Sequence, residues 1–200
     1  MASAGGSTDR LNLERSSVLV FDADPMSMAI TTQILAGFGA KHIHRCETDV
    51  AAERVVLASD QDLIIVDPSV GGESGYEFVR WLRRYGGERN RFAPVLVVTG
   101  HTQLARIVYA RDCGANFVVS KPLTPAKLLQ RILWISRDRR AHIECSAYVG
   151  PERRFKFIGP PAGLEGRRAD DFKGELGQAV QPNLSQADID AMMQPARVQL

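Results

Sequence analysis

The sequence predicts an α/β fold, with a five-stranded, doubly wound parallel sheet over residues 16–138. Two observations predict it. From residue 17 to about residue 137, short apolar runs alternate strictly with amphipathic stretches of helical spacing. The strongest runs are aliphatic, such as Leu63–Val66, which is typical of strands covered by helices on both faces. We therefore expect five strands that alternate with five helices.

Each strand is expected at a short apolar segment, and each helix at the stretch that follows it. The strand segments are residues 18–21, 42–45, 63–66, 94–98 and 117–119. Polar N-cap signals open most of the helices. They are Asp24 before Pro25, Thr48, Ser74 with Glu77 three residues later, and Thr124 before Pro125. Gly39 and Gly114 follow the helices that they end.

The bulk composition indicates a soluble cytoplasmic protein. The chain has 200 residues, is 44% hydrophobic, and carries a formal net charge of +2, which by itself favours no class of partner. No apolar run is long enough to span a membrane, and residues 1–15 resemble a flexible leader, not a signal peptide. Cys46, Cys113 and Cys145 are too far apart for a metal or redox motif, so we expect reduced thiols.

The sequence changes character after residue 138. Residues 139–183 contain many Gly, Pro and Arg residues without sustained periodicity, so we expect a largely disordered linker tail. Residues 184–194 regain helical spacing, with Ser185 as N-cap, Asp188 three residues later, and Ile189 on the apolar face. About ten residues are too few for a stable isolated helix, so this segment is expected to fold on a partner.

Polar residues with a shared chemistry follow four of the strands. Asp22 and Asp24 come after the first strand, Asp67 after the third, Thr99 after the fourth, and Lys121 after the fifth. In an open α/β sheet these positions lie at one edge. Carboxylates that repel one another suit a hard divalent cation such as Mg²⁺. A carboxylate nucleophile with Mg²⁺, a lysine and a hydroxyl can form and hold an aspartyl phosphate, with Asp67 as the acceptor.

Each of these residues alone has an ordinary structural explanation. Asp24 could cap a helix, Thr99 could start a turn, and Lys121 with Pro122 could lie in a surface loop. Their occurrence in order at the ends of successive strands favours the functional interpretation.

At this point the sequence resembles the receiver domain of two-component response regulators. The matching segments are VLVFDADP, LIIVDPSVGGESGYEF, PVLVVTG and GANFVVSKPLTP, in family order over residues 17–137. The resemblance implies a flavodoxin-like (βα)5 fold, a histidine kinase or phosphotransfer protein as phosphodonor to Asp67, and no enzymatic activity beyond self-phosphorylation and self-dephosphorylation. It also implies that Thr99 and Lys121 are the switch and phosphate-binding residues, and that Mg²⁺ is held by Asp22, Asp67 and the backbone carbonyl of Ser69.

The sequence departs from the family pattern in three places. Ala23 replaces the second acidic residue that is normally the direct metal ligand, which puts Mg²⁺ affinity in question, and Asp24 is a candidate substitute one residue on. Val70-Gly71 replaces the usual Met-Pro after the acceptor. Val118 stands where the family has a switch aromatic, and Phe117 lies one position early.

Two other functions remain open. One is a receiver fold that acts as a docking module without phosphorylation, which Ala23 makes credible. The other is a phosphatase of the haloacid-dehalogenase type, with Asp22 as nucleophile and Asp24 as acid/base. That class needs a further acidic pair after a strand, whereas Asp170 and Asp171 lie in a Gly-rich stretch.

The tail suggests partners of two kinds. Arginine pairs in residues 150–168 could bind phosphates, nucleic acid or a cyclic dinucleotide, or could lie in a solvated linker; no DNA-binding helix pair follows the receiver, so we expect no specific DNA and no membrane. The segment LSQADIDAMM resembles the N-terminal docking motif of the flagellar switch protein, which implies a chemotaxis or flagellar-motor partner, although an accidental amphipathic helix is an equal alternative. The matching residues are Leu184, Ser185, Gln186, Ile189 and Asp190.

Overall fold

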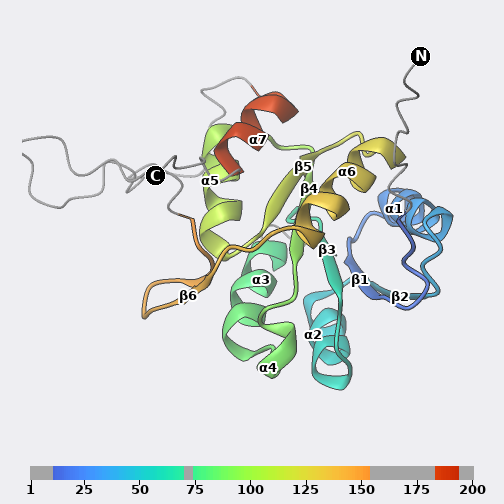
Figure 1. Ribbon diagram of the computed structural model, residues 1–200, viewed down its shortest axis with the longest axis horizontal. Helices are drawn as coiled ribbons and strands as arrows, with labels where there is room; N and C mark the ends of the chain where they lie inside the picture. The colour runs from blue at the N-terminus through green and yellow to red at the C-terminus, as the bar shows by residue number, and fades with distance from the viewer. Residues whose placement is uncertain (1–10, 70–73, 154–182, 194–200) are drawn as a thin grey trace, which may run out of the picture.

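A computed structural model describes residues 11–69, 74–153 and 183–193 of the chain. It contains a parallel sheet with the strand order β2-β1-β3-β4-β5, and helices cover both of its faces (Figure 1). The predicted fold class is therefore confirmed. The predicted helices also occur, together with one short additional helix and a hairpin.

The elements follow the predicted order along the chain. The strands of the sheet are β1 (Ser17–Phe21), β2 (His42–Cys46), β3 (Leu63–Val66), β4 (Val95–Thr99) and β5 (Phe117–Ser120). The helices are α1 (Pro25–Gly37), α2 (Asp49–Ala58), α3 (Ser74–Tyr85), α4 (Gly87–Asn90), α5 (Leu104–Cys113), α6 (Pro125–Ser136) and α7 (Gln186–Met193). Helices α2, α3 and α5 lie on one face of the sheet, and α1 and α6 lie on the other (Figure 1).

The N-caps predicted at Asp24, Thr48 and Thr124 form as the sequence suggests. The Asp24 carboxylate accepts the amide N–H groups of Met26 and Ser27 at 3.2 and 3.3 Å. Thr48 and Thr124 cap α2 and α6 in the same way, through their hydroxyl oxygens. Each bond satisfies one of the amide groups that the first turn of a helix leaves without a partner.

The core lies between the central strands and the helices that cover them. β3 and β4 are buried along their whole length, as the aliphatic runs predict. Phe21 and Phe78 meet edge to face with ring centroids 5.4 Å apart, which attaches α3 to β1. Burial of each large side chain contributes about 1.5–3 kcal/mol, so these contacts fix the sheet rigidly beneath its carboxyl edge.

A buried arginine ties the amino ends of the strands together. Arg83 of α3 is fully buried, and its guanidinium donates to the carbonyl oxygens of Gly114, Arg91 and Ala93 at 2.7–2.9 Å, and to the side chain of Asn116 at 2.9 Å. Burial lowers the pKa of Arg83 to about 10. The four acceptors compensate the desolvated charge and connect α3 to the starts of β4 and β5.

The first part of the expected linker tail is folded, which corrects the sequence-based prediction for residues 139–153. Strands β6 (His142–Glu144) and β7 (Val149–Pro151) form an antiparallel hairpin. Tyr148 is buried there and donates its hydroxyl hydrogen to the carbonyl of Pro151 at 2.6 Å. The order of this segment depends on contacts with α3, far away in the sequence, which local periodicity cannot reveal. The remainder of the predicted tail, residues 154–182, lies outside the described residues.

The predicted leader also needs a correction at its end. Leu13 is buried against the core, and its amide N–H donates to the carbonyl of Phe38 at 3.0 Å. Residues 11–15 therefore belong to the folded body, whereas residues 1–10 lie outside the described part. A single apolar residue between polar neighbours gave no periodic signal for this contact.

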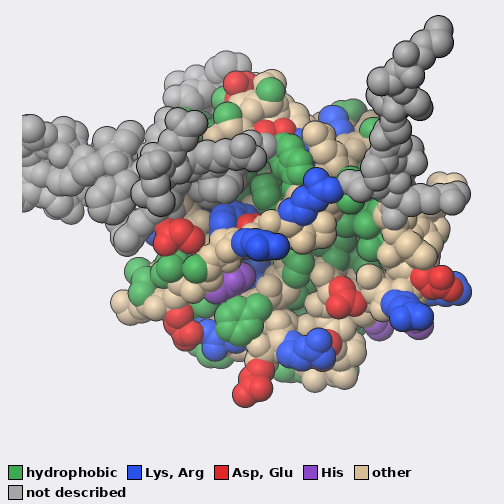
Figure 2. Space-filling view, in the orientation of Figure 1, with side chains coloured by type: hydrophobic (Ala, Val, Ile, Leu, Met, Phe, Trp, Pro, Cys, Tyr) green, Lys and Arg blue, Asp and Glu red, His purple; other side chains and the backbone are tan. Residues whose placement is uncertain are grey.

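The surface of the described part carries mixed charges. On the face shown in Figure 2, Lys and Arg side chains are interspersed with Asp and Glu side chains. This face therefore presents no stripe of a single charge sign. None of the described helices has the combined length and apolar character that a membrane crossing requires.

The hairpin contains a titratable group that makes stability depend on pH. Burial, and then the positive charge of Arg83, lower the pKa of His142 to about 4 from an ordinary value of 6.5. The neutral ring therefore stabilises the fold fully above about pH 6.5, and this contribution is lost as the pH falls from there toward about 4.

We predict that the free energy of unfolding of wild type, measured by urea denaturation, falls more steeply below about pH 6.5 than that of His142→Phe. The variant keeps a ring against Phe92, whose edge contact with His142 has a centroid distance of 5.1 Å. Carboxylates that titrate in both chains cancel in the comparison. Parallel curves for the two proteins would contradict the prediction.

Candidate functional site

The carboxyl ends of the central strands converge at one edge of the sheet. Phe21 of β1 pairs with Val66 of β3, so the next residues, Asp22 and Asp67, lie beside each other. The amide of Lys121, which follows β5, donates to the carbonyl of Thr99 at 2.8 Å. The parallel register thus brings together four of the residues that the sequence singled out.

A lysine lies between the two carboxylates. Asp22 and Asp67 are 5% and 7% exposed, and the ammonium group of Lys121 contacts Oδ2 of each, at 3.4 Å from Asp22 and closer to Asp67. Burial by itself lowers the pKa of Lys121, but the hydrogen bond and charge of Asp67, with the charge of Asp22, outweigh burial and raise it. Lys121 therefore stays protonated and holds two buried like charges together.

The second oxygen of each carboxylate is held by the backbone. Oδ1 of Asp67 accepts the amide N–H of Ser69 at 2.7 Å. Oδ1 of Asp22 accepts the amide N–H of Asp24 at 2.9 Å. Both side chains are thereby fixed with their Oδ2 atoms directed at Lys121. This preorganisation is what a site that stabilises a transferred anionic group requires.

The hydroxyl of Thr99 lies at the adjacent strand end. Thr99 is 1% exposed, and its Oγ1 accepts the amide N–H of His101 at 3.0 Å. The predicted switch hydroxyl therefore connects the end of β4 to the loop that leads to α5. Val118, at the predicted switch position, is an aliphatic residue buried in β5, and Phe117 instead packs near Trp134 with centroids 6.0 Å apart.

Some of the oxygen atoms at this edge are suitable ligands for a hard cation. Two carboxylates and the carbonyl of Ser69 are oxygen ligands of the kind that Mg²⁺ prefers, and water could complete the shell. Both oxygens of Asp24, the candidate substitute for the residue at Ala23, instead cap α1. Among the described residues, no group of three or more His, Cys, Asp or Glu side chains is placed to hold a metal ion.

The predicted docking residues of the tail lie beside this site. α7 packs along β5, and Gln186 contacts Ser120, the residue directly before Lys121 (Figure 1). Sequence reasoning identified the helix and its cap: Ser185 and Asp188 form the reciprocal bonds expected of a capping box. It missed the residues on the receiver that contact α7, because nothing local marks them. Val118 and Ser120 contact Gln186, Arg131 contacts Asp190, and Thr102 contacts Leu184, which precedes the helix.

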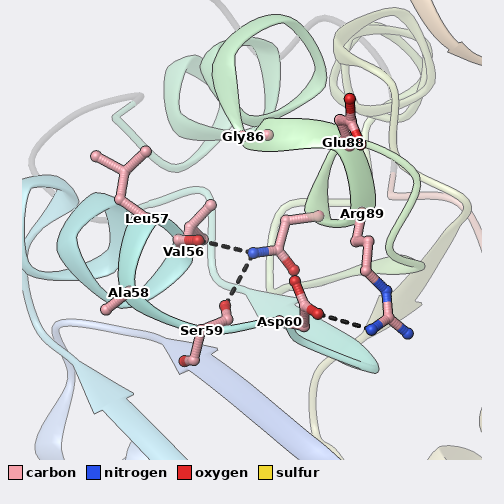
Figure 3. A pocket seen from close by; sticks show the side chains of 10 residues that line it. Val56, Leu57, Ala58, Ser59, Asp60, Gly86, Glu88 and Arg89 are labelled. Atoms are coloured by element: carbon pink, nitrogen blue, oxygen red, sulfur yellow. Dashed lines mark hydrogen bonds and ion pairs between the residues drawn. The ribbon is translucent and has the colours of Figure 1, made fainter.

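A separate hollow lies away from the carboxyl edge, between α2 and α4 (Figure 3). Asn90 lies within it and donates to the carbonyls of Val56 and Ser59 at 2.7 and 2.9 Å. Arg89 pairs with Asp60 on its rim at 2.8 Å. These bonds connect the two helices, so the hollow has a structural explanation.

Comparison with known proteins identifies the family. The family model of the response regulator receiver domain matches residues 18–133. The chain belongs to the response regulator receiver domain family. Curated relatives of this receiver include the transcriptional regulatory protein YvrH of Bacillus subtilis, 28% identical over 66% of this chain and 51% of YvrH. Response regulator PleD of Caulobacter vibrioides is 27% identical over 66% of this chain and 28% of PleD.

The receiver also resembles proteins made of little more than this fold. Chemotaxis protein CheY-3 of Vibrio cholerae is 23% identical over 58% of this chain and 87% of CheY-3. Solved structures with the same fold include CheY4 of Vibrio cholerae, with a TM-score of 0.55, 22% identity, and coverage of 60% of this chain and 98% of that one. The CKI1 receiver of Arabidopsis thaliana complexed with Mg²⁺ has a TM-score of 0.53, 22% identity, and coverage of 62% and 96%.

The share of each relative that is matched limits what transfers from it. The chain spans about half of the length of YvrH, and 28% of the length of PleD. What the comparisons establish is therefore the receiver domain itself, a component of two-component systems.

The close approach of α3 to the backbone of Asp67 and Pro68 generates a prediction about Gly75. A Cβ atom at this position would lie 2.5 Å from the carbonyl oxygen of Asp67 and 2.6 Å from Cα of Pro68. Gly75→Ala must therefore shift the backbone of Asp67 and Pro68, and we expect a loss of about 1–3 kcal/mol of stability in urea denaturation.

Gly37→Ala is the matched control, because a Cβ atom there has no neighbour within 4 Å. We expect that variant to be unchanged or about 0.4–1 kcal/mol more stable. Equal stabilities of the two variants would show that α3 does not constrain the backbone of Asp67 and Pro68.

Proposed function

We propose that this chain is a response regulator that accepts a phosphoryl group on Asp67 from a histidine kinase or phosphotransfer protein, and that it signals by protein–protein contact without DNA-binding output. The observation that carries the proposal is the contact of Lys121 with Asp67 and Asp22 at the carboxyl edge of the sheet. A phosphatase of the haloacid-dehalogenase type would need Asp24 as its acid/base, whereas both carboxylate oxygens of Asp24 cap α1.

The proposed reaction forms one bond and breaks one. A carboxylate oxygen of Asp67 attacks the phosphorus atom, and the bond from phosphorus to the donor breaks with its electron pair leaving on the donor. After the transfer the negative charge lies on the phosphoryl oxygens. Lys121 can pair with them, because its ammonium group already lies beside Oδ2 of Asp67. The chain is thus a phosphoacceptor and not an enzyme that acts on separate substrates.

Mg²⁺ is the proposed cofactor of this transfer. Asp22, Asp67 and the carbonyl of Ser69 would hold it, and bound Mg²⁺ would neutralise charge on the phosphoryl oxygens. The related CKI1 receiver was crystallised with Mg²⁺. Because Ala23 supplies no ligand and Asp24 caps α1, we propose weaker binding than a site with three carboxylates would give.

The proposed output surface adjoins the phosphoacceptor site. Thr99 and Lys121 are joined through the backbone to the loop after β4 and to the end of β5. The loop contacts Leu184, and the end of β5 contacts Gln186 of α7. A phosphoryl group that repositions Thr99 or Lys121 would therefore shift the equilibrium of this surface. A chemotaxis or flagellar-motor protein is the proposed partner of the tail segment, on the strength of its sequence resemblance.

A docking module that works without phosphorylation is the second candidate. Ala23 favours it, and so does α7, whose contacts with β5 do not involve Asp67. In that case the receiver fold would serve as a constitutive platform.

We predict that incubation with Mg²⁺ and acetyl phosphate adds one phosphoryl group to wild type, as measured by intact mass, and none to Asp67→Ala. Lys121→Met should lower the yield because it removes the cation that contacts Asp67. Absence of the mass gain in wild type, also with a phosphohistidine donor protein, would exclude the phosphoacceptor function and favour the docking module.

A second substitution tests the metal site. Ala23→Asp restores a second carboxylate next to Asp22, so the Mg²⁺ concentration for half-maximal phosphorylation should fall by about tenfold, as one additional charged ligand would give. Ala36→Asp, on the exposed side of α1, adds the same charge away from the edge and serves as the control. An equal effect of the two variants would mean that Ala23 does not limit metal binding.

A further inference from the structure

α7 completes the open edge of the sheet with a side chain. β5 is an edge strand, and its outward backbone groups lack a neighbouring strand. Oε1 of Gln186 accepts the amide N–H of Ser120 at 2.7 Å and its hydroxyl at 3.0 Å, while Nε2 donates to the carbonyl of Val118 at 3.1 Å. The primary amide of Gln186 thus pairs with β5 much as the peptide group of a sixth strand would.

A second contact fixes the segment before the helix. The amide of Leu184 donates to the carbonyl of Thr102 at 2.9 Å, and the hydroxyl of Thr102 donates to the carbonyl of Leu184 at 3.0 Å. This reciprocal pair joins the segment to the loop between β4 and α5. It determines which residue of the segment reaches β5.

The third contact is a buried charge on α6. Arg131 is 2% exposed, pairs with Asp190 of α7, and lies over the ring of Trp134 at 4.1 Å. Two of its nitrogens, Nε and Nη1, are buried without a hydrogen-bond partner among the described residues. Asp190 is therefore the group that compensates this cation, and its loss would leave a buried charge unpaired.

Apolar residues fill the space between these polar contacts. Ile189 and Met193 are 0% and 1% exposed. With Gln186 and Asp190 they occupy positions i, i+3, i+4 and i+7 of one helix face, which is the pattern of a helix laid into a groove. An eight-residue helix is not stable alone, so α7 depends on this surface for its structure.

We propose that the surface formed by β5, α6 and the loop before α5 is a helix-binding site, and that α7 is its built-in competitor. The ligand is a helix of another protein that presents Gln, then Ile three residues later, Asp four later and an apolar residue seven later. Such a helix can bind only as α7 leaves, because both need the Ser120 and Val118 backbone groups and the Arg131 guanidinium. The proposal deepens the output role proposed above, but it does not depend on the chemistry of Asp67.

The test uses the full chain and a labelled peptide of residues 183–193 as the probe. Fluorescence anisotropy of the peptide measures its binding to wild type and to a chain that carries Gln186→Ala and Ile189→Ala. We expect at least about tenfold tighter binding to the double variant, because the apparent affinity of a site rises when its internal competitor is removed. Ala191→Ser, at an exposed position of α7, is the matched control and should behave as wild type.

The emission of Trp134 reports whether α7 leaves the surface. In a Trp81→Phe background, Trp134 is the remaining tryptophan, and it lies beside Arg131. The double variant should shift this emission, and the peptide should restore it. A peptide that carries Gln186→Ala should leave the shifted emission of the double variant unchanged.

Three outcomes would overturn the proposal. Equal affinity of the peptide for wild type and the double variant would mean that the peptide binds at another site. Absence of binding to both proteins would exclude a helix-binding surface. A wild-type dimer that Gln186→Ala dissociates would make a second copy of this chain the occupant. The same assay on Asp67→Ala separates this proposal from the phosphoacceptor function, because the peptide result should be the same there.

Discussion

The parallel direction of the strands is the constraint on which the rest of the structure depends. Because β1, β3, β4 and β5 run the same way in continuous register, their carboxyl ends share one edge. That edge gathers two buried carboxylates, whose mutual repulsion would destabilise the fold if no cation lay between them. Lys121 supplies the cation, and its position at the end of β5 is fixed by the same register. Charge balance and strand pairing are therefore two aspects of one arrangement.

The edge strand β5 serves both sites at once. Its last residue, Ser120, binds Gln186, and the next residue, Lys121, binds Asp67. On the neighbouring strand, Thr99 leads into the loop whose Thr102 holds Leu184. A change in the position of either strand end would therefore alter the surroundings of Asp67 and of α7 together. Any coupling between Asp67 and α7 would pass through this shared backbone, so it needs no long chain of side chains between them.

The departure at Ala23 also has a structural consequence. A neighbouring acidic residue cannot simply take over its role, because Asp24 already caps α1 with both of its oxygens. Releasing Asp24 toward a metal would leave two amide groups of the first turn without partners, at a cost of about 1 kcal/mol. Asp24 could therefore serve a metal ion only at the expense of the first turn of α1.

The sequence by itself determined the elements with local signals. Strand runs such as Leu63–Val66, the caps at Asp24 and Thr124, and the capping box of Ser185 all depend on near neighbours in the chain, so their patterns are visible in the sequence. The convergence of Asp22, Asp67 and Lys121 followed from the rule that parallel strands share an edge. The docking position of α7 and the folding of residues 139–153 became visible only in the tertiary structure. Each of these depends on partners far away in sequence, such as Arg131 with Asp190, whose proximity only the folded chain creates.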